Sequence, residues 1–307
     1  MSREQDFIDL LARFAGDPAA RGLRDDAAVL AVGGQAIVLT HDMIVEGVHY
    51  LPTDPPEDVA WKLVAVNLSD LAAKGARPLG LLLGYPLAAE AAWDARFAEG
   101  LQAASARWNA PLLGGDTVAV PPGAARQLGL TALGEAPPGG APSRTGAQAG
   151  DRLHVTGAIG AAGLGLAAAL AGIESPWVAA YRRPVPRLAE GRHLAGLVSA
   201  MSDVSDGLLI DAARMAQASG LAVEVALDRV PLPPGAADDR EARLTAVTAG
   251  DDYELLCAAP AELTLSQPDL ATLGVVGRFT QGEGLTLTWG GRPMPLPDRL
   301  GFLHGAR

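Results

Sequence analysis

One stretch of the chain combines strong burial with acidic chemistry, namely residues 64–78 (VAVNLSDLAAKGARP). Its apolar residues leave no polar face, which predicts a helix enclosed by protein and ended by Gly75 and Pro78. Three polar residues nevertheless lie inside it: Asn67, Ser69 and Asp70. A buried ionised carboxylate needs a cation or several hydrogen-bond donors. For Asp70 this partner is either Lys74, one helical turn later, or a divalent metal ion.

Length and charge limit the classes of protein that fit. A chain of 307 residues exceeds the usual size of a single core, so we expect about two domains. The net charge of −11 argues against a nucleic-acid partner, but not against nucleotides, because bound Mg²⁺ can invert the local field. Lys62 and Lys74 are the two lysines of the chain, so phosphate contacts are expected from arginines or backbone amides.

Neither the termini nor the cysteine content suggests export. The first residues, MSREQDFIDLLARF, carry early acids and an amphipathic pattern, unlike a secretory signal. Residues 157–173 are too short and too weakly apolar for a membrane span. The single cysteine, Cys257, excludes an internal disulfide and lies in an apolar run typical of a core strand. We therefore predict a cytoplasmic protein without a membrane partner.

The sequence pattern of the first half of the chain predicts a β-sheet with helices. Apolar runs at 27–32 and 36–40 around Gly33-Gly34 predict a β-hairpin, which would bring Asp26 close to Asp42. A buried strand is expected at 78–87, a helix at 93–108 and a strand at 127–134. Between them, the glycines of LLGGDT at 112–117 predict a tight turn that exposes Asp116. The segment APPGGAP at 136–142 is a linker, which gives domains 1–142 and 143–307.

The second half begins with a strand at 152–156 and a glycine-rich turn before a helix that ends near Ala171. Residues 163–168 match the G-x-G-x-x-A pattern of dinucleotide folds, but no strand ending in an acid follows at the required distance. Ser202-Asp203 and Ser205-Asp206 open a predicted helix, either as caps or as a metal or phosphate site. Strands are expected at 221–227 and 255–258, an acidic turn at 250–254, and a hairpin at 285–291.

Six acids share one kind of setting, at a strand end, a glycine turn or a helix start: Asp26, Asp42, Asp70, Asp116, Asp203 and Asp206. If they converge, their mutual repulsion requires cations. Oxygen ligands select Mg²⁺, Mn²⁺ or Ca²⁺, and scattered carboxylates usually hold Mg²⁺ together with substrate phosphates. The alternative is a set of unrelated surface acids and helix caps, which would be expected in more polar, lysine-rich stretches.

Seven segments, in order through nearly the whole chain, carry a resemblance to a known family: DDAAVL at 25–30, LTHDMIVEGVHY at 39–50, WKLVAVNLSDLAAKGARP at 61–78, LLGGDTV at 112–118, SRTGAQAGDRLHVTG at 143–157, SDVSDGL at 202–208 and AGDDYELL at 249–256. Together they resemble thiamine-monophosphate kinases, which belong to a wider superfamily of ATP-using synthetases related to aminoimidazole ribonucleotide synthetase.

The resemblance implies a two-domain α/β fold. Its N-terminal mixed sheet and helices would form a homodimer interface, and its C-terminal α/β domain would complete the active-site cleft. The implied reaction transfers the γ-phosphoryl group of ATP to thiamine monophosphate, giving thiamine diphosphate and ADP. Because the acceptor is already an anionic phosphate oxygen, no protein nucleophile or general base is needed, and several Mg²⁺ ions would align the two phosphate chains.

The resemblance also assigns residues. The expected metal ligands, direct or through water, are Asp26, Thr40, His41, Asp42, Asp70, Asp116, Asp203 and Asp206. The expected ATP contacts are Trp108, Gly115, Asp116, Arg144 and Ser205. The expected contacts to thiamine phosphate are His49, Asp251 and Phe302. Simpler roles stay open for some of them: His49 as a polar loop residue, Arg144 as a linker cation and Phe302 as a core anchor.

The sequence departs from the family pattern at Arg24, His41, Asp251 and Leu303. His41 replaces a small hydroxyl residue beside Asp42, where a backbone carbonyl could substitute for the lost metal contact. Asp251 replaces a glutamate and shortens its reach by about one methylene. Two other functions stay open: another ATP-using synthetase of the superfamily, or a non-catalytic homologue that binds nucleotide or metal.

Overall fold

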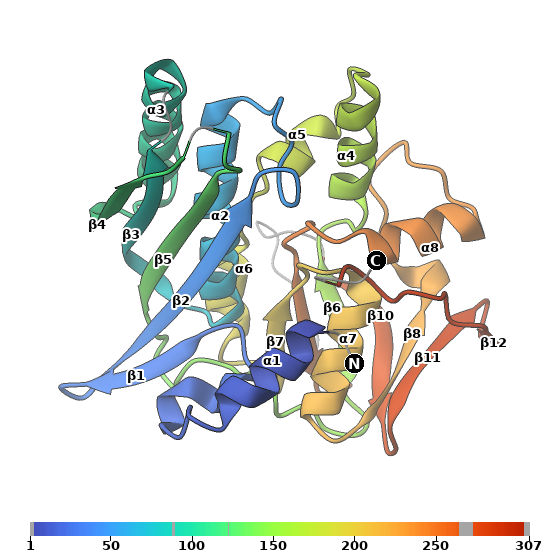
Figure 1. The fold of residues 1–307 in the computed structure, drawn as a ribbon. Coiled ribbons are helices and arrows are strands. Elements are labelled where there is room, and N and C mark those ends of the chain that lie inside the picture. Colours follow the sequence, from blue (N-terminus) through green and yellow to red (C-terminus); the bar gives the residue numbers. More distant parts are fainter. Residues whose placement is uncertain (1–2, 88–89, 122, 264–272, 304–307) are drawn as a thin grey trace.

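Two β-sheets, each built from one half of the chain, organise the molecule (Figure 1). The computed structural model describes residues 3–87, 90–121, 123–263 and 273–303. All strands of the five-stranded sheet come before residue 136, and all strands of the seven-stranded sheet come after residue 151. This mixed α/β architecture confirms the predicted fold class.

The first sheet has the strand order β1-β2-β5-β3-β4, antiparallel except for the parallel pair β3 and β4. Its elements in chain order are α1 (Arg3–Ala12), a 3-10 helix (Pro18–Leu23), β1 (Ala28–Val32), β2 (Gln35–Val45), α2 (Pro56–Ala73), β3 (Arg77–Leu87), α3 (Ala91–Trp108), β4 (Leu112–Ala119) and β5 (Gln127–Glu135). The predicted hairpin is confirmed: Gly33 and Gly34 both have positive φ, which a two-residue turn between β1 and β2 requires.

The second sheet has the order β12-β11-β8-β10-β6-β9-β7, with β11 and β8 as its parallel pair. Its elements are β6 (Arg152–Thr156), α4 (Ala161–Ala171), α5 (Val178–Arg182), α6 (Leu188–Leu194), β7 (Ala200–Asp203), α7 (Leu208–Ala218), β8 (Ala222–Ala226), a 3-10 helix (Leu227–Arg229), α8 (Arg240–Ala249), β9 (Leu255–Ala259), β10 (Leu273–Thr280), β11 (Gly284–Trp289) and β12 (Arg292–Met294). Residues of helices α7 and α8 pack with this sheet in one hydrophobic core. Cys257 on β9 is buried, as predicted.

Helix α2 lies between the two halves. It contacts β2 and β5 on one side, and α6, β7 and β9 on the other (Figure 1). Every residue from Lys62 to Ala73 is buried, which confirms the enclosed helix, although the helix begins earlier than predicted, at Pro56. Gly75 follows the C-cap with φ +60°, and a Cβ there would lie 2.5 Å from the Cβ of Ala195. The helix therefore ends where both conformation and packing require glycine.

Two predictions about local structure were wrong. Residues 112–117 form most of strand β4, not a tight turn. Ser202 and Asp203 end strand β7, and the following helix begins only at Leu208, so neither residue is a helix cap.

The G-x-G-x-x-A pattern at 163–168 lies within α4, and the N-terminus of this helix already has an anionic partner in the protein. The N-terminus of α4 is occupied by the Asp252 carboxylate, which accepts from the N–H groups of Gly160 (2.8 Å) and Ala162 (3.3 Å). Among the helices that the structure describes, none is long and apolar enough to cross a membrane.

Candidate active site

The polar residues of α2 hold side chains from both sheets. The Thr40 hydroxyl on β2 donates to Asp70, and the Asp42 N–H donates to Asn67 Oδ1 at 3.0 Å. Toward the other sheet, Ser69 Oγ donates to Asp203 Oδ2 at the end of β7, at 2.6 Å. The three polar residues that seemed out of place in a buried helix therefore join β2 to β7.

The structure separates His41 from this group. Successive side chains of a strand point to opposite faces, so Thr40 and Asp42 face α2 while His41 faces away. Its Nδ1 lies 2.9 Å from Thr131 Oγ1 on the neighbouring strand, and the residue is exposed. Within one chain, the His41 side chain therefore does not join the predicted metal ligands Thr40 and Asp42, because the pleat of β2 turns it to the opposite face.

Burial and neighbouring carboxylates raise the pKa of three of the predicted acids. Burial, reinforced by the charges of Asp26 and Asp206, raises the pKa of Asp42 to about 6. Burial and the charge of Asp26 raise the pKa of Asp203 to about 8, although the Ser69 hydroxyl opposes this change. The pKa of Asp70 is raised in the same way, by burial and then by Asp42, Asp203 and Asp26. We call Asp26, Asp42, Asp70 and Asp203 the acid cluster.

Lys74 contacts the acid cluster through Asp26 and not through Asp70. Its ammonium pairs with Asp25 and, at 2.8 Å, with Asp26, and its side chain is fully buried. Of the two partners considered for Asp70, Lys74 therefore pairs with other acids instead. Burial opposes the ionisation of Asp25, but Lys74 and further donors lower its pKa to about 2. Arg144 also pairs with Asp26, so the linker arginine does reach the acid cluster.

Sequence reasoning missed the residue that shapes the loop after β7. Asp211, in the first turn of α7, is 2% exposed, and its Oδ2 accepts from the N–H groups of residues 205, 206 and 207 at 3.1, 3.1 and 3.2 Å. Arg214 pairs with both Asp206 and Asp211. The signal for this role was present in the sequence, since an acid within a few residues of a Ser-Asp-Gly turn can accept from its free N–H groups.

The donor set of this region suits a hard cation. Within the described ranges, no three His, Cys, Asp or Glu side chains form a ready-made metal site. The carboxylates are instead held by cations and hydroxyls, and they outnumber the cations by three when all are ionised: Asp25, Asp26, Asp42, Asp70, Asp203, Asp206 and Asp211 against Arg21, Lys74, Arg144 and Arg214. Oxygen ligands with excess negative charge fit Mg²⁺.

Two of the predicted substrate residues, His49 and Asp251, contact Lys62 near the other end of α2. Lys62 donates to the carbonyl of His49 at 2.8 Å and pairs with Asp251 at 2.7 Å. The Asp251 N–H donates to the Ser205 carbonyl at 2.7 Å, and the Phe302 N–H donates to the Asp206 carbonyl at 2.8 Å. The structure thus connects His49, Asp251 and Phe302 with the loop after β7.

Three of the predicted ATP or metal contacts, Asp116, Gly115 and Trp108, lie away from the acid cluster in the structure. Strand register places Asp116 at the opposite edge of the sheet from Asp42, on the face that carries Met43. A Cβ on Gly115 would lie 1.9 Å from the Leu83 carbonyl oxygen, so close packing of β4 on β3 requires glycine at this position. Trp108 packs on Trp61 at 4.6 Å between ring centroids. Within one chain, these residues do not join the acid cluster.

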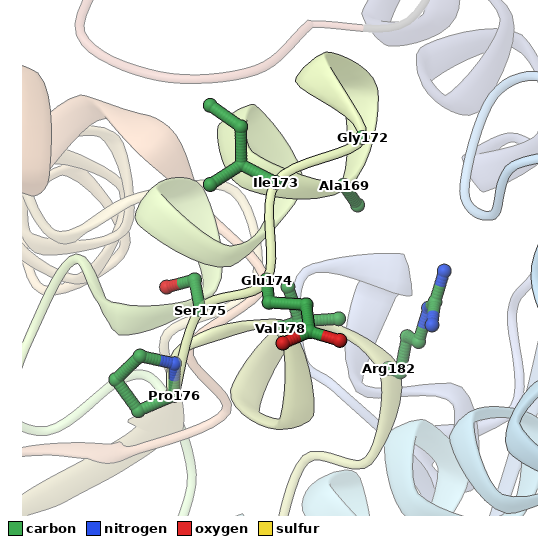
Figure 2. Close-up of a pocket in the computed structure, with 8 residues that line it drawn as sticks. All are labelled: Ala169, Gly172, Ile173, Glu174, Ser175, Pro176, Val178 and Arg182. Atoms are coloured by element: carbon green, nitrogen blue, oxygen red, sulfur yellow. The ribbon is translucent and has the colours of Figure 1, made fainter.

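A surface hollow of about 630 Å³ lies where α4 meets α5 (Figure 2). Glu174 and Arg182 lie at its wall with Ile173 and Pro176, and none of the predicted site residues lines it. Arg182 also pairs with Asp54 at 2.7 Å, so its guanidinium is engaged. We assign this hollow no part in the site.

Comparison with known proteins decides the family. Residues 24–136 match the N-terminal domain of AIR synthase related proteins, and residues 148–290 match the C-terminal domain. A thiamine-monophosphate kinase of Caulobacter vibrioides is 41% identical over 308 residues, covering 94% of this chain and 87% of the relative. One from Salmonella typhimurium is 35% identical, covering 93% and 92%. The chain belongs to the thiamine-monophosphate kinase family.

Solved structures agree with this family assignment. A complex of AaThiL with AMPPCP and TMP has a TM-score of 0.84 at 28% identity, covering 97% of this chain and 96% of that chain. The thiamine-monophosphate kinase of Stenotrophomonas maltophilia has a TM-score of 0.74 at 32% identity, covering 91% and 95%. The predicted family and its two-domain synthetase-like fold are confirmed.

Proposed function

We propose that this thiamine-monophosphate kinase family member transfers the γ-phosphoryl group of ATP to thiamine monophosphate, giving thiamine diphosphate and ADP with Mg²⁺ present. One observation carries the proposal: Asp26, Asp42, Asp70 and Asp203, drawn from both halves of the chain, meet around α2, and burial and mutual repulsion raise the pKa of Asp42, Asp70 and Asp203. Named relatives with this activity cover nearly the whole chain.

The polar residues of α2 suggest how the two substrates are arranged. Lys62, Asp70 and Lys74 are spaced by eight and four residues, which places them on one stripe of the helix. At 1.5 Å per residue, Asp70 lies about 12 Å from Lys62 and about 6 Å from Lys74 along the axis. We assign the Lys74 end, with Asp26 and Arg144, to ATP, together with the side chain of Ser205, whose carbonyl accepts from the Asp251 N–H. The Lys62 end, with His49 and Asp251, is assigned to thiamine monophosphate.

For this reaction the protein has to position the two substrates and neutralise the charge of their phosphates. Thiamine monophosphate brings its own anionic nucleophile, so no side chain has to remove a proton. Asp26, Asp42, Asp70, Asp203 and Asp206, with the Thr40 hydroxyl, would hold Mg²⁺, which would supply the positive charge that neutralises the phosphate chains. Thr40, Asp70 and Asp203 are buried, which limits the access of water, and Asp211 fixes the loop that presents Ser205 and Asp206.

A second copy of the chain is part of the proposal. The face of the five-stranded sheet opposite α2 exposes large apolar side chains on four strands: Leu30, Val32, Met43, Leu82 and Val118. Such a patch is typical of an interface, and we propose a homodimer through this face. Asp116 shares this face, so a role for it at a metal site would involve the dimer. The cytoplasmic location stays a prediction.

The test incubates the protein with ATP, Mg²⁺ and thiamine monophosphate and measures thiamine diphosphate. Asp42→Asn should reduce turnover by about a thousandfold, because it removes a charge directly at the reacting phosphates. The matched control is Asp94→Asn on α3, whose carboxylate accepts from Tyr85 at 2.6 Å away from the acid cluster. Nucleotide binding by folded wild-type protein without turnover would support the non-catalytic alternative.

A further inference from the structure

Lys62 is a buried cation whose contacts lie at the substrate end of α2. Its side chain is 2% exposed. The ammonium lies 2.7 Å from Asp251 Oδ2, donates to the His49 carbonyl at 2.8 Å, and sits 4.2 Å from the centroid of the Tyr181 ring. One lysine on α2 therefore connects the loop after β2, the acidic turn before β9 and helix α5.

The surroundings of Lys62 fix its ammonium in place. Tyr181 is itself 2% exposed, and its hydroxyl donates to Asp54 at 3.0 Å, while Arg182 pairs with the same carboxylate at 2.7 Å. The aromatic ring under the ammonium is thus anchored at its far end. A buried cation is stable when it is paired and hydrogen-bonded, and here the pairing carboxylate is Asp251.

Asp251 is held in an unusual way for a residue expected to contact substrate. Its φ is +63°, a left-handed conformation that only a few non-glycine residues adopt. Its carboxylate lies between Lys62 and the hydroxyl of Tyr253, which donates to Oδ1 at 3.1 Å. The side chain of Asp251 is still 29% exposed. The carboxylate is therefore oriented from two buried sides and open on another.

We propose that Lys62 is a positioning residue of the thiamine monophosphate site, which orients the Asp251 carboxylate and anchors the His49 loop at the same time. This inference rests on the proposed function. An ionised, oriented Asp251 presents oxygen acceptors to hydrogen-bond donors of the thiamine moiety. Because aspartate is one methylene shorter than glutamate, its carboxylate depends on this buried cation for its place. Lys62 lies about 12 Å from Asp70 along α2, so it acts on binding of the acceptor and not on the metal ligands.

The test compares Lys62→Met, Asp251→Asn and the double variant in steady-state kinetics, varying each substrate at saturation of the other. We expect Lys62→Met to raise the KM for thiamine monophosphate roughly ten- to a hundredfold, with the KM for ATP within about twofold of wild type. The double variant should be no worse than the worse single variant, because both changes disrupt one unit. Arg278→Met is the matched control, since it breaks an exposed ion pair with Glu224 on the seven-stranded sheet and touches neither Lys62 nor its partners.

Several results would overturn the inference. They are an unchanged KM for thiamine monophosphate in Lys62→Met, an equal rise in both KM values, or effects of Lys62→Met and Asp251→Asn that simply multiply. Lys62→Gln, which keeps a donor for the His49 carbonyl, replaces Lys62→Met in the same comparison if the methionine variant does not fold. A wild-type protein that makes no thiamine diphosphate would instead overturn the proposed function itself, so the two failures are distinguishable.

Discussion

Asp211 provides the sharpest test of how the loop after β7 is built. Its Oδ2 accepts three backbone N–H groups, from Ser205, Asp206 and Gly207, and its Oδ1 pairs with Arg214 at 3.0 Å. Asp211→Asn keeps the size of the side chain but removes its charge. A hydrogen bond to a charged acceptor contributes about 1 kcal/mol more than one to a neutral acceptor, so the loss over three bonds is about 3 kcal/mol.

The assay combines urea unfolding with steady-state kinetics. We expect Asp211→Asn to lower the free energy of unfolding by about 3 kcal/mol and to raise the KM for ATP at least about tenfold, because Ser205 and Asp206 lose their orientation. Asp239→Asn is the matched control: Asp239 caps α8, accepts from the N–H groups of Glu241 and Ala242 at 3.0 Å, and is exposed. Asparagine caps helices as well as aspartate does, so this variant should behave like wild type. Unchanged ATP kinetics in a destabilised Asp211→Asn would refute the reasoning.

Three further predictions concern stability and assembly. Burial lowers the pKa of His154 to about 4, so the unfolded chain binds a proton first as pH falls below 6.5; wild type should lose about 2 kcal/mol more than His154→Leu between pH 7 and pH 5 in urea unfolding. An equal loss in both proteins would contradict this. Lys74→Met removes the fully buried cation shared by Asp25 and Asp26, which keep only Arg21 and Arg144, and should lower the free energy of unfolding by about 3 kcal/mol, with part of the loss recovered on adding Mg²⁺. No response to Mg²⁺ would contradict the second half of that expectation. Met43→Glu, on the exposed face of the five-stranded sheet, should shift the mass in light scattering from dimer to monomer, and a wild-type monomer would exclude the proposed interface.

The enclosed helix and the acid cluster were predictable because each follows from a local conflict in the sequence. Asp70 in an apolar helix requires compensation wherever that helix packs, and a hairpin with a Gly-Gly turn brings its two ends together. The structure confirms the enclosed helix through the burial of α2, and the hairpin places the Thr40 hydroxyl 3.4 Å from the Asp26 carbonyl.

Other features depend on contacts that local patterns do not encode. Glycines in LLGGDT are equally compatible with a turn and with a strand that approaches its neighbour closely. The pairing of β4 with β3, in which Gly115 lies against the Leu83 backbone, decides for the strand. The choice of Lys74 between Asp70 and Asp25 was likewise undetermined, because a lysine at i+4 can turn toward any acid its long side chain reaches. Sequence spacing also left His41 beside Asp42, although the pleat of β2 separates them.

Helix α2 explains why two halves of such different topology would work as one enzyme. Its side chains bond to residues of β2 through Asn67 and Asp70, and to β7 through Ser69. Lys62 and Lys74 extend these links to the acidic turn before β9 and to the start of β1. A shift of one sheet relative to the other would break several of these contacts together, because they share one rigid helix. The geometry of the acid cluster is therefore coupled to the packing of α2, and substitutions on its polar stripe should change stability and substrate binding jointly.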